Sequence, residues 1–286
     1  MADFDFLAVG DGPAALSACL TARARGLTTL CLGTGEESPL ARTERIDNYP
    51  GLPHVSGREL LAVFRRQALE AGVEMRTGLV RQVQPLGKEL MVLAGADVLT
   101  ARTVLLAMGA AKPKLLPGEE ELLGQGVSWC GTCDGMFYRG KRVAVLSWLK
   151  SGAEEADFLA GLAGETDYYV MRPHDLPETR HWRLREETPL SLRRTEEGIL
   201  LRTDRGGDTY DGVFLFHQAV APEMLLRGLK TDGPFIQVDG EQRTGIPGVF
   251  AAGDCTGKPL QVAKAVGEGC RAAIAAARYL AEEKKE

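Results

Sequence analysis

The start of the chain contains the pattern that most restricts its fold. Residues 4–9 are a short apolar run of strand length, and Gly10-Asp11-Gly12-Pro13-Ala14 follows it directly. Residues 16–25 are rich in Ala and Leu, which predicts a helix that ends at Gly26, and residues 27–32 are typical of a second strand. In such a βαβ unit the glycines let the backbone approach a pyrophosphate at the helix N-terminus. The pattern therefore predicts an α/β fold that begins with a dinucleotide-binding unit.

Two strand ends bear on how a ribose could be held. An acidic residue commonly lies at the end of the second strand of this unit, whereas here the strand runs into Leu32-Gly33-Thr34, with Glu36 and Glu37 as the next carboxylates. Near the other end of the chain, residues 247–252 form a strand that meets Gly253-Asp254. The Asp254 carboxylate could accept a hydrogen bond from a ribityl or ribose hydroxyl, or simply cap a turn.

A pair of thiols is the second informative feature. Cys130 and Cys133 are separated by two residues, so they can close and reopen a disulfide ring and store two electrons reversibly. The same spacing occurs in zinc sites, but the other Cys and His residues have no spacing that would complete one. The sequence therefore favours redox chemistry. Asp134 can carry the proton that accompanies thiolate chemistry, although a carboxylate before Gly135 is also typical of a turn.

Length and composition set the general class. The 286 residues, 44% of them hydrophobic, are enough for one large or two modest cores, and two domains are expected. The net charge of −5 argues against binding to nucleic acid or to an anionic membrane. No stretch approaches the length of a membrane span, and scattered cysteines suit a reducing compartment. We therefore expect a soluble, cytoplasmic protein.

The middle of the chain predicts a second unit of the same type with an altered turn. Residues 141–146 are expected to form a strand, and residues 154–163 a helix. The turn between them is Ser147-Trp148-Leu149-Lys150-Ser151-Gly152, so it has no glycine where a nucleotide-binding turn needs one.

Several motifs in fixed order resemble those of the low-molecular-weight thioredoxin reductases, over nearly the whole chain. The resemblance implies an α/β fold of two Rossmann-like dinucleotide-binding domains. Residues 1–112 and 234–286 would form a discontinuous FAD-binding domain, and residues 113–233 an inserted central domain with the thiols. The matching motifs are Gly10-Asp11-Gly12-Pro13-Ala14, Asn48-Tyr49-Pro50-Gly51, Cys130-Gly131-Thr132-Cys133-Asp134-Gly135, Gly248-Val249-Phe250-Ala251-Ala252-Gly253-Asp254, Gln261 and Gly267-Glu268-Gly269-Cys270.

The resemblance also implies a mechanism, FAD as the cofactor, and a homodimer. Cys133 would lie against the flavin, Cys130 would attack the disulfide of thioredoxin, and Asp134 would protonate the departing thiolate. No metal is expected. The residues expected to bind FAD are Gly10, Gly12, Pro13, Ala14, Asn48, Gly253, Asp254 and Gln261.

Two departures concern the electron donor. Members of the family that use NADPH have a glycine-rich turn where this chain has residues 147–153, and Trp148 would occupy the space that a pyrophosphate needs. Their His-Arg-Arg cluster, which holds the 2′-phosphate, appears here as Met171-Arg172-Pro173. The chain is thus similar to the ferredoxin-dependent flavin thioredoxin reductases, which lack the nucleotide site. The deeply rooted thioredoxin reductases lack it as well. Flavins accept single electrons and deliver pairs, so ferredoxin is the expected donor.

Other functions stay open at this point. The chain could use NADPH through a non-standard site, or be a thioredoxin reductase-like flavoprotein with another donor or a redox-sensing role. A ferredoxin–NADP reductase is disfavoured because it needs the missing nucleotide site. Trp129 could stack on the flavin, face thioredoxin or simply pack, and residues 37–40 replace the family's Gly-Gly-Gln-Leu loop. An acidic ferredoxin needs a basic surface, for which the candidates are Arg180, Arg183, Arg185, Arg193, Arg194, Arg202 and Arg205, although nearby acidic residues nearly cancel their charge.

Overall fold

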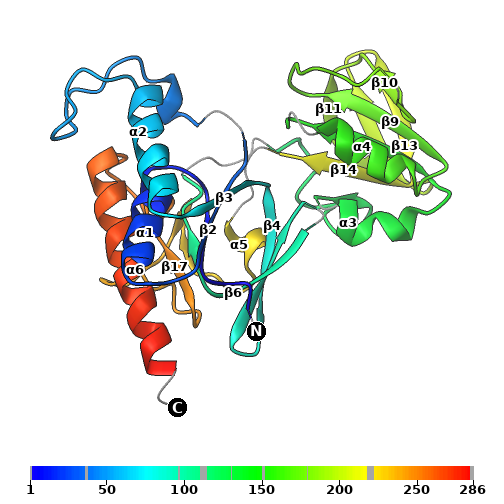
Figure 1. Cartoon of the computed structure of the whole chain (residues 1–286). Coiled ribbons are helices and arrows are strands. Elements are labelled where there is room, and N and C mark those ends of the chain that lie inside the picture. The colour runs from blue at the N-terminus through cyan, green and yellow to red at the C-terminus, as the bar shows by residue number, and fades with distance from the viewer. Residues whose placement is uncertain are drawn as a thin grey trace. The chain divides into compact units, whose positions relative to one another are not determined.

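The chain folds into two compact units. The computed structural model describes residues 2–35, 38–95, 97–109, 115–129, 131–149, 152–178, 180–217 and 222–283, without the side chain of Cys133. The first unit consists of Met1–Lys112 and Ala219–Glu286, and the second is Pro113–Gln218 (Figure 1). The two Rossmann-like domains that the sequence predicts are confirmed. Within the described ranges no helix is long and apolar enough to cross a membrane.

A seven-stranded sheet forms the centre of the first unit, in the order β3-β2-β1-β6-β5-β4, with β17 also paired to β6. Strands β1, β2, β3, β6 and β17 are parallel, whereas β4 and β5 are antiparallel additions. Strands β2 and β17 are buried along their whole length, as is typical of parallel strands covered on both faces, whereas the edge strand β3 is mostly exposed. The strands are β1 Phe4–Val9, β2 Thr29–Gly33, β3 Glu74–Thr77, β4 Val80–Leu86, β5 Glu89–Ala94, β6 Asp97–Leu106 and β17 Val249–Ala251.

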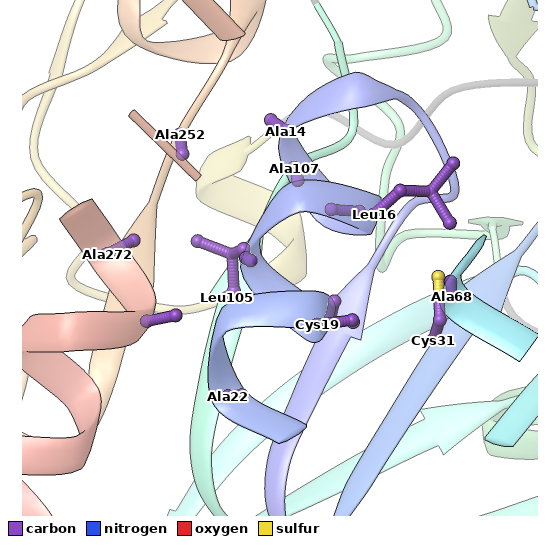
Figure 2. Packing of buried hydrophobic residues seen from close by; sticks show 14 of the residues in the cluster. Ala14, Leu16, Cys19, Ala22, Cys31, Ala68, Leu105, Ala107, Ala252 and Ala272 are labelled. Carbon is purple, nitrogen blue, oxygen red and sulfur yellow. The ribbon is translucent and has the colours of Figure 1, made fainter. Parts of the chain in front are cut away.

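Helices α1 (Pro13–Ala24) and α6 (Val262–Glu283) bring the two ends of the chain together on this sheet (Figure 1). They pack closely because small residues line the contact. A side-chain carbon built on Gly269 would lie 2.1 Å from the Ala14 carbonyl oxygen. Figure 2 shows Cys19 of α1, Leu105 of β6 and Ala272 of α6 in the same buried cluster. The first strand, the first helix and the last helix thus form one core.

Helix α2 (Gly57–Glu70) packs against α1, and it begins with a capping box. The Ser56 side chain accepts from the Glu59 backbone, and the Glu59 carboxylate accepts from Ser56 N at 2.7 Å, which satisfies two backbone donors at the helix start. The short elements of this unit are η1 Leu40–Arg42, α5 Pro222–Leu225, β15 Thr231–Asp232, β16 Phe235–Ile236 and η3 Asp254–Thr256.

The first unit takes in residues 219–233, which the sequence analysis assigns to the central domain. Leu225, Leu226 and Leu229 are buried against the same sheet face as Val83 and Leu90. The second segment of the first unit therefore begins at residue 219 rather than at residue 234. Burial of these leucines stabilises this arrangement, because the removal of apolar area from water is a main stabilising contribution.

A parallel five-stranded sheet forms the centre of the second unit, in the order β10-β9-β8-β14-β7. An antiparallel sheet of β11, β12 and β13 adds to it. The predicted strand over 141–146 is β8, and the predicted helix over 154–163 is α4. The elements are β7 Val127–Ser128, α3 Gly131–Asp134, η2 Gly135–Tyr138, β8 Arg142–Ser147, α4 Gly152–Ala160, β9 Glu165–Val170, β10 Arg183–Arg185, β11 Pro189–Arg194, β12 Ile199–Thr203, β13 Gly206–Tyr210 and β14 Gly212–Phe216.

Candidate functional site

The turn between β1 and α1 is shaped to receive an anion. Gly10 has φ +112°, and a side-chain carbon on it would lie 2.3 Å from the Ala107 carbonyl oxygen, so only glycine fits. Gly12 precedes the helix, and no described atom lies within 4 Å of where its side chain would begin. Pro13 starts α1, whose N-terminus has no hydrogen bond from a described capping side chain. Its first N–H groups are therefore available to a phosphate.

The loop after β17 meets this turn. A side-chain carbon on Gly253 would lie 2.9 Å from the Ala14 Cβ, which places the loop beside the start of α1. The Gly253 N–H donates to Glu268 Oε2 at 2.9 Å, and Lys264 Nζ donates to the Gly253 carbonyl oxygen at 2.9 Å. Lys264 and Glu268 thus hold the backbone just before Asp254. The sequence analysis did not assign a role to either residue, although Glu268 lies in a quoted motif.

The Asp254 carboxyl lies in a setting that suits a neutral hydrogen-bonding ligand. Burial raises its pKa, with the Lys264 charge opposing this effect and the Glu268 charge adding to it. No described side chain donates a hydrogen bond to this carboxyl, so its acceptor capacity is available to a hydroxyl group.

Asn48 and Gln261 are 213 residues apart in sequence, and the fold brings them together. Asn48 Nδ2 donates to Gln261 Oε1 at 2.7 Å. Gln261 directly precedes α6, whereas Asn48 lies in the loop between η1 and α2. The predicted FAD residues therefore form two local groups, one at the start of α1 and one formed by this pair. Their glycine turn, open helix N-terminus and available carboxyl fit the pyrophosphate and hydroxyl groups of FAD.

The thiol segment belongs to the second unit. Cys130 and the Cys133 side chain lie outside the described residues, as do Glu36, Glu37, Lys150 and Ser151. The backbone from Gly131 to Asp134 forms the short helix α3. Asp134 accepts a hydrogen bond from Ser128 Oγ at 2.7 Å, so its carboxyl is oriented at the end of the predicted thiol motif. Directly after it, Met136 and Phe137 are 58% and 73% exposed.

A packed polar and aromatic cluster lies at the carboxyl edge of the second sheet. Trp129, Trp148 and His217 follow the neighbouring strands β7, β8 and β14. Trp148 stacks on the His217 ring with centroids 4.3 Å apart, and His217 Nε2 lies 2.5 Å from Glu119 Oε1. Glu119 is fully buried, and it also accepts from Trp129 Nε1 at 2.7 Å and from Leu116 N at 2.8 Å. We call these four side chains, Glu119, Trp129, Trp148 and His217, the edge cluster.

The edge cluster occupies the place where nucleotides bind in related folds. In open α/β sheets, ligands bind beyond the carboxyl ends of the parallel strands. Here Ser147 Oγ accepts the Leu149 N–H at 3.1 Å, and a side-chain carbon on Gly152 would lie 2.3 Å from the Tyr168 hydroxyl. The turn is therefore closed by its own side chains. Trp129 packs within the edge cluster through its contacts with Glu119 and His217. Packing is one of the three roles that the sequence analysis left open for it.

Comparisons with known proteins agree with this architecture. The profile of the pyridine nucleotide-disulphide oxidoreductase family matches residues 4–174 and 196–269. The thioredoxin reductase of Aquifex aeolicus is 32% identical, over 99% of this chain and 95% of its own length. A ferredoxin-flavin thioredoxin reductase from Clostridium acetobutylicum is 32% identical, with a TM-score of 0.91 over 98% of both chains. A thioredoxin reductase from Gloeobacter violaceus is 31% identical, with a TM-score of 0.78 over 99% of this chain and 96% of that one.

Proposed function

Because the chain belongs to the thioredoxin reductase family of the pyridine nucleotide-disulphide oxidoreductases, we propose that reduced ferredoxin, rather than NADPH, is its electron donor. Its cofactor is FAD, which when bound can accept electrons one at a time and donate them as a pair. The thiols of Cys130 and Cys133 would then reduce the disulfide of thioredoxin.

The edge cluster is the observation that carries the choice of donor. A nicotinamide nucleotide would need the carboxyl edge of the second sheet, where Trp148 stacks on His217 and Glu119 joins His217 to Trp129. Opening that edge would separate the hydrogen bonds of the buried Glu119 carboxyl with Trp129, His217 and Leu116, and each lost bond costs about 0.5–1.5 kcal/mol. The similar Clostridium acetobutylicum protein, a ferredoxin-flavin enzyme, supports the same choice.

The chemistry at the thiols follows from disulfide exchange. The Cys130 thiolate attacks one sulfur of the thioredoxin disulfide, forms a mixed disulfide and releases the other sulfur as a thiolate. Cys133 then attacks the Cys130 sulfur, which frees the second thioredoxin thiol and leaves the enzyme as a disulfide. Two electrons and two protons pass to thioredoxin. Asp134, oriented by Ser128, supplies a proton to a departing thiolate.

Met136 and Phe137 support a protein as the disulfide substrate. Large exposed apolar side chains beside a reactive pair are typical of a protein contact, and these two directly follow the thiol motif. We expect thioredoxin to cover them during exchange.

The basic docking surface for ferredoxin is narrower than the sequence suggests. Arg183 and Arg185 bind the buried Asp167 at 2.7 and 3.1 Å, so their charges are already paired. The exposed arginines stay candidates, namely Arg180, Arg193, Arg194, Arg202 and Arg205. The expected homodimer and cytoplasmic location belong to the same proposal.

The test is an anaerobic reduction followed by flavin absorbance at about 450 nm. The protein is mixed with NADPH in one experiment and with reduced ferredoxin in the other. We expect bleaching by ferredoxin alone, and loss of thioredoxin reduction in Cys130→Ser and Cys133→Ser. Rapid bleaching by NADPH would refute the proposed donor, and thioredoxin reduction by the double variant would refute the role of the thiols.

A further inference from the structure

The carboxylate of Asp11 lies where the glycine turn meets the end of β2. A side-chain carbon built on Gly33, the last residue of β2, would lie 2.6 Å from Asp11 Cγ and 2.7 Å from Asp11 Oδ2. Asp11 therefore fills the space above the end of that strand, next to the open position in front of Gly12. In dinucleotide folds an acidic residue at this strand end commonly binds a ribose hydroxyl, and this strand ends in glycine.

Arg65 holds this carboxylate from α2. Its Nη2 atom lies 2.5 Å from Asp11 Oδ2, and the two side chains are 43% and 23% exposed. The Arg65 Nε atom is buried and has no hydrogen-bond partner among the described residues. A guanidinium has five N–H donors, so Arg65 can hold Asp11 and still donate to another acceptor.

The charge of Asp11 explains why the arginine is needed. The N-terminus of α1 attracts anions, and the first helical turn contains no acidic residue. Asp11 lies just before this turn, where its negative charge would repel a pyrophosphate. Pairing with Arg65 neutralises that charge while one carboxylate oxygen keeps acceptor capacity.

We propose that Asp11 replaces the acidic residue missing from the end of β2, and that it accepts a hydrogen bond from a ribose hydroxyl in the adenosine half of FAD. Arg65 is the residue that positions and neutralises it. The inference rests on the proposed placement of FAD at the turn from Gly10 to Ala14, and it is independent of the electron donor.

The test measures flavin affinity rather than turnover. The full-length protein is stripped of FAD, and dissociation constants are determined by flavin fluorescence for FAD and for analogues that lack the 2′- or the 3′-hydroxyl of the adenosine ribose. At least one analogue should bind wild type about 10- to 100-fold more weakly than FAD, as expected for a hydrogen bond to a charged group. In Asp11→Ala this discrimination should fall to about twofold or less, whereas Asp97→Ala, at an exposed position of the same unit, should keep it.

Arg65 provides a second, separate readout. Arg65→Gln should weaken FAD binding about tenfold, because it leaves the Asp11 charge beside the pyrophosphate, whereas the exposed neighbour variant Arg66→Gln should not. Arg65→Lys should restore part of the affinity. Adding Asp11→Asn to Arg65→Gln should also restore part of it, because the uncompensated charge is then removed.

The outcomes separate this inference from the proposed function. If wild type binds FAD without discriminating among the analogues, or if Asp11→Ala discriminates as well as wild type, the role of Asp11 is wrong and the function stands. If the variants change only the melting temperature of the stripped protein, the pair is structural and the inference fails. If wild type does not bind FAD at all, both proposals fall.

Discussion

The two units use the same strand–turn–helix arrangement with opposite results. In the first unit, Gly10 and Gly12 leave open space in front of α1. In the second, Ser147 and Trp148 fill the equivalent turn with side chains, and Trp148 packs on His217. Both sheets nonetheless have three parallel strands at the turn, β2-β1-β6 in the first unit and β9-β8-β14 in the second. The difference teaches that the buried strands maintain such a fold whether its turn is open or filled by side chains.

The packing of β8 and β14 explains why the second unit tolerates a filled turn. Val143, Val145 and Leu146 of β8 are fully buried, as are Phe214 and Phe216 of β14. Each such side chain contributes about 1.5–3 kcal/mol when it leaves water. None of this stabilisation requires a bound ligand.

The largest expected effect is the loss of bound FAD when a side chain is placed in the turn between β1 and α1. Gly10→Ala forces a side chain into a left-handed position and against the Ala107 carbonyl oxygen, at a cost of about 2–6 kcal/mol from strain and overlap together. We expect purified protein without FAD, measured as the flavin-to-protein absorbance ratio. Gly87→Ala is the control, because Gly87 has φ +64° with no described atom within 4 Å of its added carbon, and it should cost only about 1–2 kcal/mol. Normal flavin content in Gly10→Ala would remove the argument for this turn.

The stability of the second unit should depend more on contacts at the amino ends of its parallel strands than on its turn. Asp167 is 1% exposed and binds Arg142, Arg183, Arg185 and the Tyr210 hydroxyl. Asp167→Asn should therefore lower the free energy of unfolding by about 1.5–3 kcal/mol near pH 7, because hydrogen bonds to a buried carboxylate are lost, although Arg142 and Arg185 keep Asp208 as a partner. Urea denaturation measures this, with the exposed Asp175→Asn as control.

The difference in unfolding free energy between wild type and Asp167→Asn should depend on pH, and the direction of that dependence follows from the pKa of Asp167. Burial works to raise the pKa of Asp167, but hydrogen bonds from Arg183 and Tyr210 and the neighbouring arginine charges bring it below its ordinary value of 3.8. A lowered pKa in the folded state stabilises the protein above the ordinary value, and this contribution is lost as the pH falls through the folded value. The gap between wild type and Asp167→Asn should therefore shrink in acid. A constant gap would mean that the ion pairs do not account for it.

A smaller loss of stability is expected from a substitution inside the edge cluster. Glu119→Gln replaces an acceptor of three hydrogen bonds with an amide, so a buried donor of Trp129, His217 or Leu116 loses its partner. The expected loss of stability is about 1–3 kcal/mol. Thermal unfolding followed by tryptophan fluorescence measures it against the exposed neighbour variant Glu120→Gln. Equal melting temperatures would show that the cluster contributes little to folding.

The smallest expected effect concerns nucleotide use. Trp148→Ala removes the ring that stacks on His217, but residues 171–173 still lack the His-Arg-Arg cluster that holds a 2′-phosphate. NADPH should therefore reduce the flavin of this variant no faster than that of wild type, in stopped-flow absorbance. A rate increase of tenfold or more would mean that Trp148 alone separates the two turns.

Local patterns predicted the fold well, whereas contacts across the chain were out of reach. The apolar runs at 4–9 and 141–146 predicted β1 and β8 because a buried parallel strand needs such a run. Asn48 and Gln261 were each identified by resemblance, but their hydrogen bond was not predicted, since no local rule joins residues so far apart. Glu119 was missed because a single buried carboxylate has no sequence signature.

Three other features had a signal that was available in the sequence. Trp148 and His217 each directly follow an apolar strand of the same sheet, and the ends of parallel strands share one edge. Asp11 lies between two glycines of a predicted phosphate-binding turn. Its negative charge would repel a phosphate there, so the sequence could have indicated that a basic residue pairs with it. The early return at residue 219 follows from the leucines at 225, 226 and 229, which indicate burial in a core.

The discontinuous first unit has a consequence for the order of events during synthesis. The central unit is one continuous segment, so it can fold while translation is still in progress. The first unit cannot, because Gly269 must pack against Ala14 and Ser17 Oγ must donate to the carbonyl oxygen of Val266, 249 residues later. If FAD binds at the turn from Gly10 to Ala14, as proposed, its binding must wait until α6 has been synthesised, and a chain that stalls on the ribosome before α6 contains the thiol segment without a complete FAD site.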